Sequence, residues 1–306
     1  MRTKLMAVTL ALGAWVTGTA IGTMGTVPAA TAQPLLMFGR AHADYAPVLD
    51  GSEPIFIFLL GSDARPGTPV DHGLCDSIHI LGIDPASGRA TLLGIPRDSW
   101  VPLSGGGEGK INSSMPPGGP EAEIATIENL TGITADYYAL TGFKGLARAV
   151  NEVGGITVDN PYTFVGDVRT FEEGVHTLDG HAALGFARTR HSLPRGDFDR
   201  SENQGRLLIG ALQTFQKAFA KDPTVMFTWL GAGGRWVQTS LSLDELTTLA
   251  FTGLDLKSKN ITNMVVPGTS AMVGSMSTVS LSPDAQGYFD DLKADGYILP
   301  KDLPAA

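Results

Sequence analysis

Short apolar runs of strand length alternate with segments of helical periodicity from about residue 50 onward. The first run, Ile55 to Leu60, is continuously apolar and ends at Gly61-Ser62-Asp63, as a buried strand leading into a loop does. Residues 77–83 and 90–95 are two more strand-like runs, and the turn-rich segment between them predicts a hairpin. This alternation favours a sheet with helices packed on it.

The remainder of the chain continues the pattern. Helices are expected over 120–130, 142–153, 178–187, 197–219, from Ser242 or Asp244 to 254, and over 284–292; strands are expected over 137–140, 156–158, 261–266 and, less distinctly, 279–281. No internal repeat or linker interrupts residues 50–300. We therefore predict one α/β domain with a C-terminal helical portion.

Composition excludes several classes of function. The chain has 306 residues and a formal net charge of -9, which argues against nucleic acid as the main ligand, because such proteins usually carry a basic surface. The single cysteine, Cys75, allows no intrachain disulfide and is expected to be a small buried hydrophobe. The six histidines lack metal-ligand spacing, and His79 is expected in the core. Residues 104–110 resemble a phosphate-binding loop only superficially and are expected to form a flexible surface loop.

The N-terminus predicts delivery to a membrane. Arg2 and Lys4 precede a continuously apolar segment over 5–27, and the next charge is Arg40, so a span with a cytoplasmic N-terminus is expected. A cleaved signal peptide is the alternative, because Ala30-Thr31-Ala32 resembles a processing site. The predicted organisation is a cytoplasmic stub with an anchor or signal over 1–33, a linker over 34–52 and an extracytoplasmic catalytic domain over 53–300. The protein is expected at the cell membrane as a single-pass protein, or secreted after cleavage.

The stretch from Phe186 to Arg206 holds five arginines and no lysine. They are Arg188, Arg190, Arg195, Arg200 and Arg206. Arginine offers a planar fork that grips phosphate oxygens two at a time, so this cluster predicts an anion site. A salt-bridged helix start is the alternative. If a helix begins at Asp197, then Asp197, Arg200 and Gln204 lie on one face.

Polar clusters also stand at strand ends, where open α/β sheets commonly bind ligands. They are Asp63 with Arg65, Asp76 with Ser77, and Arg97 with Asp98. Arginines facing carboxylates are suited to phosphoryl transfer, and magnesium needs only one or two protein carboxylates, here Asp63 and Asp76. Both could instead be turn formers. Outside the membrane no nucleotide is supplied, so an already activated lipid-linked pyrophosphate is the expected donor.

Seven ordered segments resemble one family. They are LLGSDAR (59–65), DSIHIL (76–81), LLGIPRDSWV (92–101), KINSSM (110–115), VNEVGGITVDNP (150–161), LDGHAALGFARTR (178–190) and GDFDRSENQ (196–204). They resemble the LytR-CpsA-Psr (LCP) proteins, which attach glycopolymers to bacterial peptidoglycan, over about residues 53–295. The resemblance implies a mixed β-sheet sandwiched between helices, a three-layer α/β/α domain behind an N-terminal membrane span.

The resemblance also implies roles for individual residues. Asp63 and Asp76 are the expected ligands of Mg2+ (or Mn2+), and Arg97 is expected to act in catalysis as well as binding. The pyrophosphate-binding residues implied are Arg65, Arg97, Arg188, Arg190, Arg200 and Gln204. Asp197 is the first choice for the catalytic base and Asp98 the second. Many family members carry arginine where this chain has Leu74. The expectation is that phosphate binding is weaker in this chain or that Arg195 takes the place of the missing arginine.

The implied function is a phosphotransferase. A peptidoglycan sugar hydroxyl would attack the sugar-proximal phosphorus of a polyprenyl-pyrophosphate glycan and release polyprenyl phosphate. The alternatives are a pyrophosphatase on the same lipid and a non-catalytic polyprenyl-phosphate-binding envelope protein. The expected partners are the lipid-linked donor, peptidoglycan and the membrane, with no nucleic acid and no prediction of oligomeric state.

Overall fold

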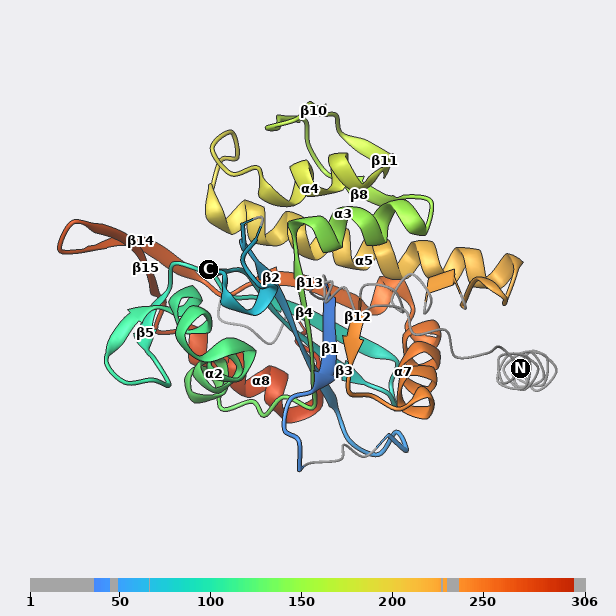
Figure 1. Ribbon diagram of the computed structural model, residues 1–306, viewed down its shortest axis with the longest axis horizontal. Coiled ribbons are helices and arrows are strands. Elements are labelled where there is room, and N and C mark those ends of the chain that lie inside the picture. Colours follow the sequence, from blue (N-terminus) through green and yellow to red (C-terminus); the bar gives the residue numbers. More distant parts are fainter. Residues whose placement is uncertain (1–35, 45–48, 66, 227, 230–236, 300–306) are drawn as a thin grey trace.

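The computed structural model describes residues 36–44, 49–65, 67–226, 228–229 and 237–299 (Figure 1). Its largest sheet has seven strands in the order β12-β1-β7-β2-β3-β4-β13. The strands are β1 (Leu36–Arg40), β2 (Ile55–Ser62), β3 (Cys75–Asp84), β4 (Arg89–Gly94), β7 (Tyr137–Gly142), β12 (Val237–Thr239) and β13 (Ile261–Val265). Strands β2, β3 and β4 are antiparallel, whereas β7 runs parallel to β2 and β13 runs parallel to β4. The sheet is therefore mixed, and the predicted 77–83 to 90–95 hairpin is confirmed.

Both faces of the sheet are apolar because successive side chains of a strand point to opposite sides. In β2, Phe58 and Leu60 join the core beneath α2 (Met115–Thr131) and α8 (Ala285–Asp295), while Ile55 and Ile57 join the core beneath α7 (Leu243–Asp255). Helix α5 (Asp197–Lys221) also lies on the second face, against β3, β4 and β13. The expected layers, helices on both faces of a mixed sheet, are confirmed (Figure 1).

A smaller layer lies outside α5. It contains α3 (Phe143–Glu152), α4 (Gly180–Arg188), β8 (Ile156–Asn160), β9 (Phe164–Val165), β10 (Thr170–Phe171) and β11 (Gly174–Leu178). Its core includes Phe164, Phe171 and Phe186, whose rings contact one another. Helix α5 approaches β8 closely at Gly210, where a Cβ would stand 2.5 Å from the carbonyl oxygen of Thr157. The strand expected over 156–158 exists, but it pairs with β11 in a separate sheet rather than with the central one.

One part of the sequence prediction is wrong and another is incomplete. Leu36–Arg40, assigned to a linker over 34–52, is β1, which pairs with β7 on one side and β12 on the other. A five-residue segment in which only Gly39 is fully buried carries too little periodicity to be seen alone. The expected short strand near 279–281 is half of a hairpin made by β14 (Gly268–Val273) and β15 (Met276–Leu281).

The other elements are short. They are the hairpin strands β5 (Trp100–Pro102) and β6 (Glu108–Lys110) and the 3-10 helices Val70–His72, Ile111–Ser113 and Ser258–Asn260. The segment 104–110, expected to be a flexible loop, is therefore partly the turn of a hairpin. Helix α7 begins after Ser242, whose hydroxyl and Glu245 form a capping box, so Ser242 rather than Asp244 opens it.

The predicted anchor over 1–33 lies outside the described residues, and none of the described helices is long and apolar enough to cross a membrane.

Candidate functional site

The polar strand ends meet at one edge of the sheet. Because β2 and β3 are antiparallel, as are β3 and β4, the C-terminal end of β2, the N-terminal end of β3 and the C-terminal end of β4 lie side by side. Asp63, Asp76 and Arg97 stand at these three positions. The expectation that the strand-end clusters converge is therefore confirmed, and the register of the sheet is the cause.

A cavity of about 460 Å³ opens at this edge between the sheet and helices α3, α4 and α5. Its polar lining is Ser62, Asp63, Arg65, Asp76, Ser77, Arg97, Thr141, Asp167, Arg188, Arg190, His191, Arg200 and Gln204. Its apolar lining includes Leu36, Leu59, Ala139, Phe143, Leu146, Leu184, Leu207 and Leu208. The site thus joins an arginine-rich part to a part that only a hydrocarbon group would fill favourably.

The start of α5 is fixed against the sheet by close contacts. The buried ring of His79 on β3 donates from Nε2 to the carbonyl oxygen of Ser201 at 3.0 Å. Gly94 on β4 leaves room for the same turn, since a Cβ there would lie 2.4 Å from Ser201 Oγ. Burial lowers the pKa of His79 to about 4, so the ring is neutral and structural, as the sequence predicted. Arg200 is thereby held at the cavity wall, 5% exposed, with Nη2 donating to the carbonyl oxygen of Asp76 at 3.3 Å.

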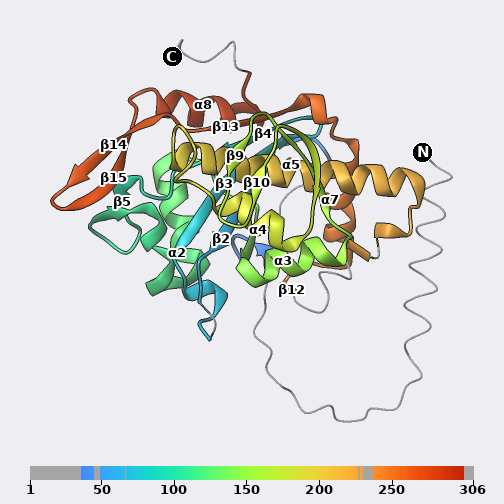
Figure 2. The same ribbon diagram turned by 90° about the horizontal axis from the view of Figure 1, so that it is seen from above.

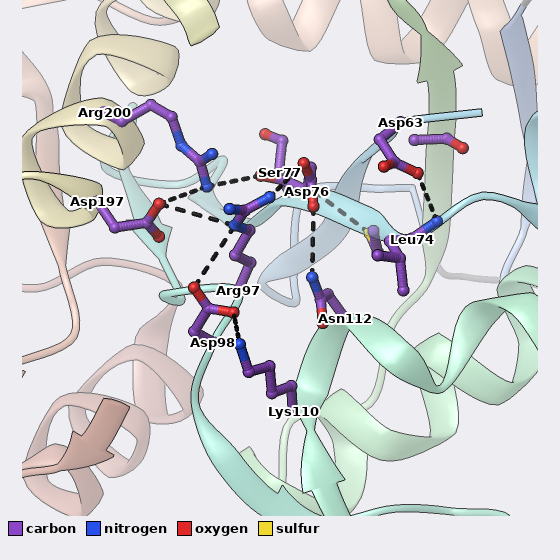
Figure 3. Close-up of polar contacts among 12 residues, drawn as sticks. Asp63, Leu74, Asp76, Ser77, Arg97, Asp98, Lys110, Asn112, Asp197 and Arg200 are labelled. Carbon is purple, nitrogen blue, oxygen red and sulfur yellow. Dashed lines mark hydrogen bonds and ion pairs between the residues drawn. The ribbon is translucent and has the colours of Figure 1, made fainter. Parts of the chain in front are cut away.

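Arg97 lies at the centre of a ring of carboxylates (Figure 3). Its Nη1 donates to Asp76 Oδ2, and its Nε lies 3.7 Å from both Asp98 Oδ2 and Asp197 Oδ1. Burial acts to lower the pKa of Arg97, but the hydrogen bond and charge of Asp76, together with Asp197 and Asp98, outweigh it and raise the pKa. Arg97 is therefore a permanent cation that three acids hold in one place.

The two candidate bases lie next to Arg97 and are not part of the cavity lining among the described residues. Asp197 Oδ1 lies 2.8 Å from Arg200 Nη2, and burial raises the pKa of this carboxyl although Arg200 and Arg97 act to lower it. Asp98 Oδ1 lies 2.8 Å from Lys110 Nζ. Both carboxylates are thus ion-paired, and the raised pKa of Asp197 makes it the better candidate for a proton acceptor.

The arginine stretch divides into two groups. Arg188, Arg190 and Arg200 line the cavity, and the Arg188 guanidinium lies 4.6 Å from the centre of the Phe143 ring. Arg195 instead pairs with Asp199 and Glu202, and Arg206 pairs with Glu202. The idea that Arg195 substitutes for the arginine missing at position 74 is therefore wrong, because its own helix turn supplies its partners. Leu74 is 38% exposed, and its main-chain N–H donates to Asp63 Oδ1 at 2.8 Å.

The donor set fits a hard divalent cation. Asp63 and Asp76 line one cavity together with Arg65 and Arg97, and magnesium typically takes one or two protein carboxylates and fills its shell with phosphate oxygens and water. Among the described residues no group of three or more Asp, Glu, His or Cys side chains is arranged to hold a metal unaided. A cation here would depend on the substrate's phosphates for its remaining ligands.

Sequence reasoning did not single out Lys110 and Asn112 as functional residues. Asn112, in the 3-10 helix after β6, donates from Nδ2 to Asp76 Oδ1 at 3.3 Å, and its main-chain N–H donates to the carbonyl oxygen of Arg97 at 3.3 Å. Lys110 contacts Asp98. Both belong to the KINSSM segment, which resembles the family but for which no residue role was predicted. Polar side chains in such a segment were the signal that could have identified them.

A neutral carboxyl lies beneath the site. Glu123 on α2 is fully buried beside Cys75 and hydrogen-bonds with Ser114 Oγ. Burial raises the pKa of Glu123 to about 8, against an ordinary 4.5. At neutral pH it can therefore donate to Ser114, whose hydroxyl donates to the carbonyl oxygen of Ile111 at 2.9 Å. Cys75 is also fully buried, as expected for a small core residue, and burial raises the pKa of its thiol.

Glu123→Gln is expected to stabilise the protein above about pH 5. The unfolded chain loses the Glu123 proton near pH 4.5 whereas the folded protein keeps it to about pH 8, so wild-type stability falls across that window. The full difference is on the order of 5 kcal/mol, from about 1.4 kcal/mol per pKa unit. Urea unfolding at pH 4, 6 and 8 measures it, with Glu121→Gln on the exposed face of the same helix as the control. Parallel pH dependence in wild type and Glu123→Gln would contradict the burial argument.

Comparison with known proteins identifies the family and the fold. The sequence profile of the LytR_cpsA_psr family matches residues 38–293. The chain belongs to the LytR_cpsA_psr family. This LytR_cpsA_psr protein is 33% identical over 222 residues to the polyisoprenyl-teichoic acid–peptidoglycan teichoic acid transferase TagU of Oceanobacillus iheyensis, a match that covers 71% of this chain and 68% of the relative. It is 32% identical to the protein of the same name from Bacillus anthracis, covering 71% of this chain and 70% of the relative.

Solved structures match as well. The crystal structure of Bacillus subtilis TagV superposes on this LytR_cpsA_psr protein with a TM-score of 0.68 at 29% sequence identity, covering 81% of this chain and 99% of TagV. A structure of TagT bound to LI-WTA gives a TM-score of 0.66 at 23% identity, covering 83% of this chain and 94% of TagT, which shows the shared fold. The suspected family membership and the mixed α/β architecture are thereby confirmed.

Proposed function

We propose that this protein transfers a glycopolymer from a polyprenyl-pyrophosphate carrier to a sugar hydroxyl of peptidoglycan. The observation that carries the proposal is the cavity itself, in which five arginines and three aspartates adjoin an apolar pocket. A pyrophosphate with a hydrocarbon tail matches both parts, whereas a nucleotide or free phosphate would leave the apolar lining unused. The names of the TagU relatives, which are teichoic acid–peptidoglycan transferases, support the same reaction class.

The residues divide the work of binding. Arg188, Arg190 and Arg200 would bind the pyrophosphate oxygens together with Arg65 and Arg97, and Gln204 contributes from the same wall. Gln204 is itself oriented, because its Nε2 donates to the carbonyl oxygen of Ala187 at 3.1 Å. Asp63 and Asp76 would hold Mg2+ or Mn2+, which when bound would neutralise phosphate charge. The polyprenyl chain would lie against the apolar lining.

The proposed reaction is a displacement at the sugar-proximal phosphorus. The acceptor hydroxyl loses its proton to Asp197, its oxygen forms the new bond to phosphorus, and the bond to the bridging oxygen breaks to release polyprenyl phosphate. Arg97 stands between the candidate bases and the cavity, so it can stabilise charge on the phosphoryl oxygens as that bond breaks. Asp98, paired with Lys110, is the second candidate for the proton acceptor.

Product analysis tests the proposal. Purified protein, a polyprenyl-pyrophosphate oligosaccharide and insoluble peptidoglycan are expected to yield polyprenyl phosphate and peptidoglycan-linked phosphosaccharide, and chelation of divalent cations is expected to lower the yield at least tenfold. Free phosphate-terminated saccharide with no linked product would instead make the protein a pyrophosphatase. Binding of polyprenyl phosphate with no turnover would show that the protein is a non-catalytic lipid-binding protein.

Membrane attachment through residues 1–33 is part of the proposal, and fractionation of cells expressing the full chain tests it.

Ala139→Phe is expected to weaken binding of long polyprenyl phosphates. Ala139 on β7 lines the apolar part of the cavity, and a phenyl ring there would occupy space needed by the tail. Loss of one or two isoprene contacts corresponds to at least about tenfold in Kd. Calorimetric titration with a long-chain and a ten-carbon isoprenyl phosphate measures it. Equal losses for both chain lengths would show that the ring disturbs the phosphate part instead of the tail part.

A further inference from the structure

The β14–β15 hairpin projects from the molecule (Figures 1 and 2). Its base is joined to the site by main-chain contacts. The N–H of Val279 donates to the carbonyl oxygen of Asp98 at 2.8 Å, and Val279 forms a parallel bridge with Ser99. The base of the hairpin is therefore joined to the turn that carries Asp98, and a molecule lying along the hairpin would reach Arg97 from outside the cavity.

The hairpin surface is uncharged in an acidic protein. No charged residue occurs between Lys259 and Asp284, although the chain has a formal net charge of -9. The exposed side chains are hydroxyls and thioethers, namely Thr269, Ser270, Met272, Ser275, Met276, Ser277 and Ser280. Met272 is 64% and Met276 46% exposed. Hydroxyls with small apolar patches suit an uncharged sugar chain, which offers hydroxyls and C–H faces, and they repel neither sign of charge.

Trp100 extends this surface toward the site. Ser99 and Val279 form a parallel bridge, so the next residue on each strand, Trp100 and Ser280, also lie side by side. Residues that lie side by side in a parallel pair point to the same face, so Trp100 and Ser280 share one face. Ser280 is itself opposite Thr269 in the hairpin. An indole beside two hydroxyls is a suitable platform for a sugar ring, because the ring's apolar face can stack on the aromatic face.

The position of the hairpin separates it from the lipid part of the cavity. Leu36, which belongs to the apolar lining, is on β1, and β7, β2, β3 and β4 lie between β1 and β13, the strand that leads into the hairpin. Asp98 and Asp197 lie between these two sides. An uncharged surface on the side opposite the lipid tail is where the second substrate must approach.

We propose that the β14–β15 hairpin and Trp100 form the acceptor-glycan surface, which binds an uncharged stretch of peptidoglycan sugar chain and presents its hydroxyl to the carboxylates beside Arg97. This inference rests on the proposed transferase function. It assigns the acceptor to a surface that none of the predicted site residues occupies.

Charge substitutions at the exposed positions test the inference. The double variants Thr269→Asp/Met276→Asp and Thr269→Lys/Met276→Lys, on the face that also holds Ser280, are expected each to weaken sedimentation with purified peptidoglycan at least fivefold, because either charge must be desolvated under an uncharged sugar. The acceptor KM is expected to rise by a similar factor while kcat at saturating acceptor changes less than twofold. Val175→Asp, 67% exposed on β11, is the matched control. Unchanged thermal stabilisation by polyprenyl phosphate verifies folding.

The outcomes separate this inference from the function on which it rests. Wild-type affinity and acceptor KM in both double variants would overturn the acceptor surface and leave the transferase standing. Hairpin-dependent binding of peptidoglycan by a wild type that transfers nothing would support the surface and overturn the proposed function. If only the lysine variant gains affinity for vesicles containing anionic lipid, with peptidoglycan binding unchanged, the hairpin faces a membrane and the inference is wrong.

Discussion

Arg97→Ala is expected to lower kcat by about 10²-fold or more, the size of effect seen when one preorganised donor to a transition-state oxyanion is removed. Arg97 is the group that joins the cavity to both candidate bases, since it contacts Asp76, Asp98 and Asp197. Without it the carboxylates face one another unshielded, and the pKa of Asp197 rises further because Arg97 is one of the charges that lower it. The low-pH limb of kcat/KM should therefore move to higher pH in this variant.

The same stretch of sequence that supplies the arginines also supplies a control. Arg206→Ala removes a guanidinium from the same helix as Arg200, but Arg206 pairs with Glu202 and lies outside the cavity lining, so activity is expected to stay within about twofold of wild type. Arg200→Ala, by contrast, should cost roughly tenfold or more in turnover. Steady-state kinetics on circular-dichroism-verified protein measures all three. Wild-type rates for both Arg97→Ala and Arg200→Ala would show that these arginines do not bind the reacting phosphates.

Asp197→Asn is expected to cost about 10²–10⁴-fold in kcat, the usual contribution of a positioned general base. Burial raises the pKa of Asp197, so wild-type kcat/KM should rise with pH through a value above the ordinary 3.8. Below that value the carboxyl is protonated and cannot accept the acceptor's proton. The residual activity of Asp197→Asn should lack this limb, because the amide does not titrate.

Asp98→Asn distinguishes the two candidates. Asp98 is paired with Lys110, so its replacement should weaken an ion pair that orients the region and leave the acidic limb in place. The measurement is a pH profile of kcat/KM for both variants with the same donor and acceptor. If the limb disappears in Asp98→Asn and persists in Asp197→Asn, the roles are the reverse of those proposed.

Several elements were predictable because the signal was local. Ile55 to Leu60 and the hairpin over 77–95 have apolar runs bounded by turn residues, and α5 begins at Asp197 as its spacing indicated. Strand β1 was missed because five residues carry little periodicity, and β8 was placed in the wrong sheet because a strand's local pattern does not name its partner. The hairpin of β14 and β15 was seen only as a short strand, since its exposed and uncharged residues do not alternate.

The candidate site divides in the same way. The sequence by itself determined which side chains were available for the site, because the arginines and aspartates at the strand ends and in the matched segments can be read directly from it. Only the tertiary structure decided which of them meet. The antiparallel register brings Asp63, Asp76 and Arg97 to one edge of the sheet, and the contact of His79 with α5 holds Arg200 there. Arg195 pairs with neighbouring acids instead of joining the site. The first two outcomes depend on contacts between residues far apart in the chain, which no local pattern in a single sequence encodes, whereas the partners of Arg195 stand close to it in the sequence.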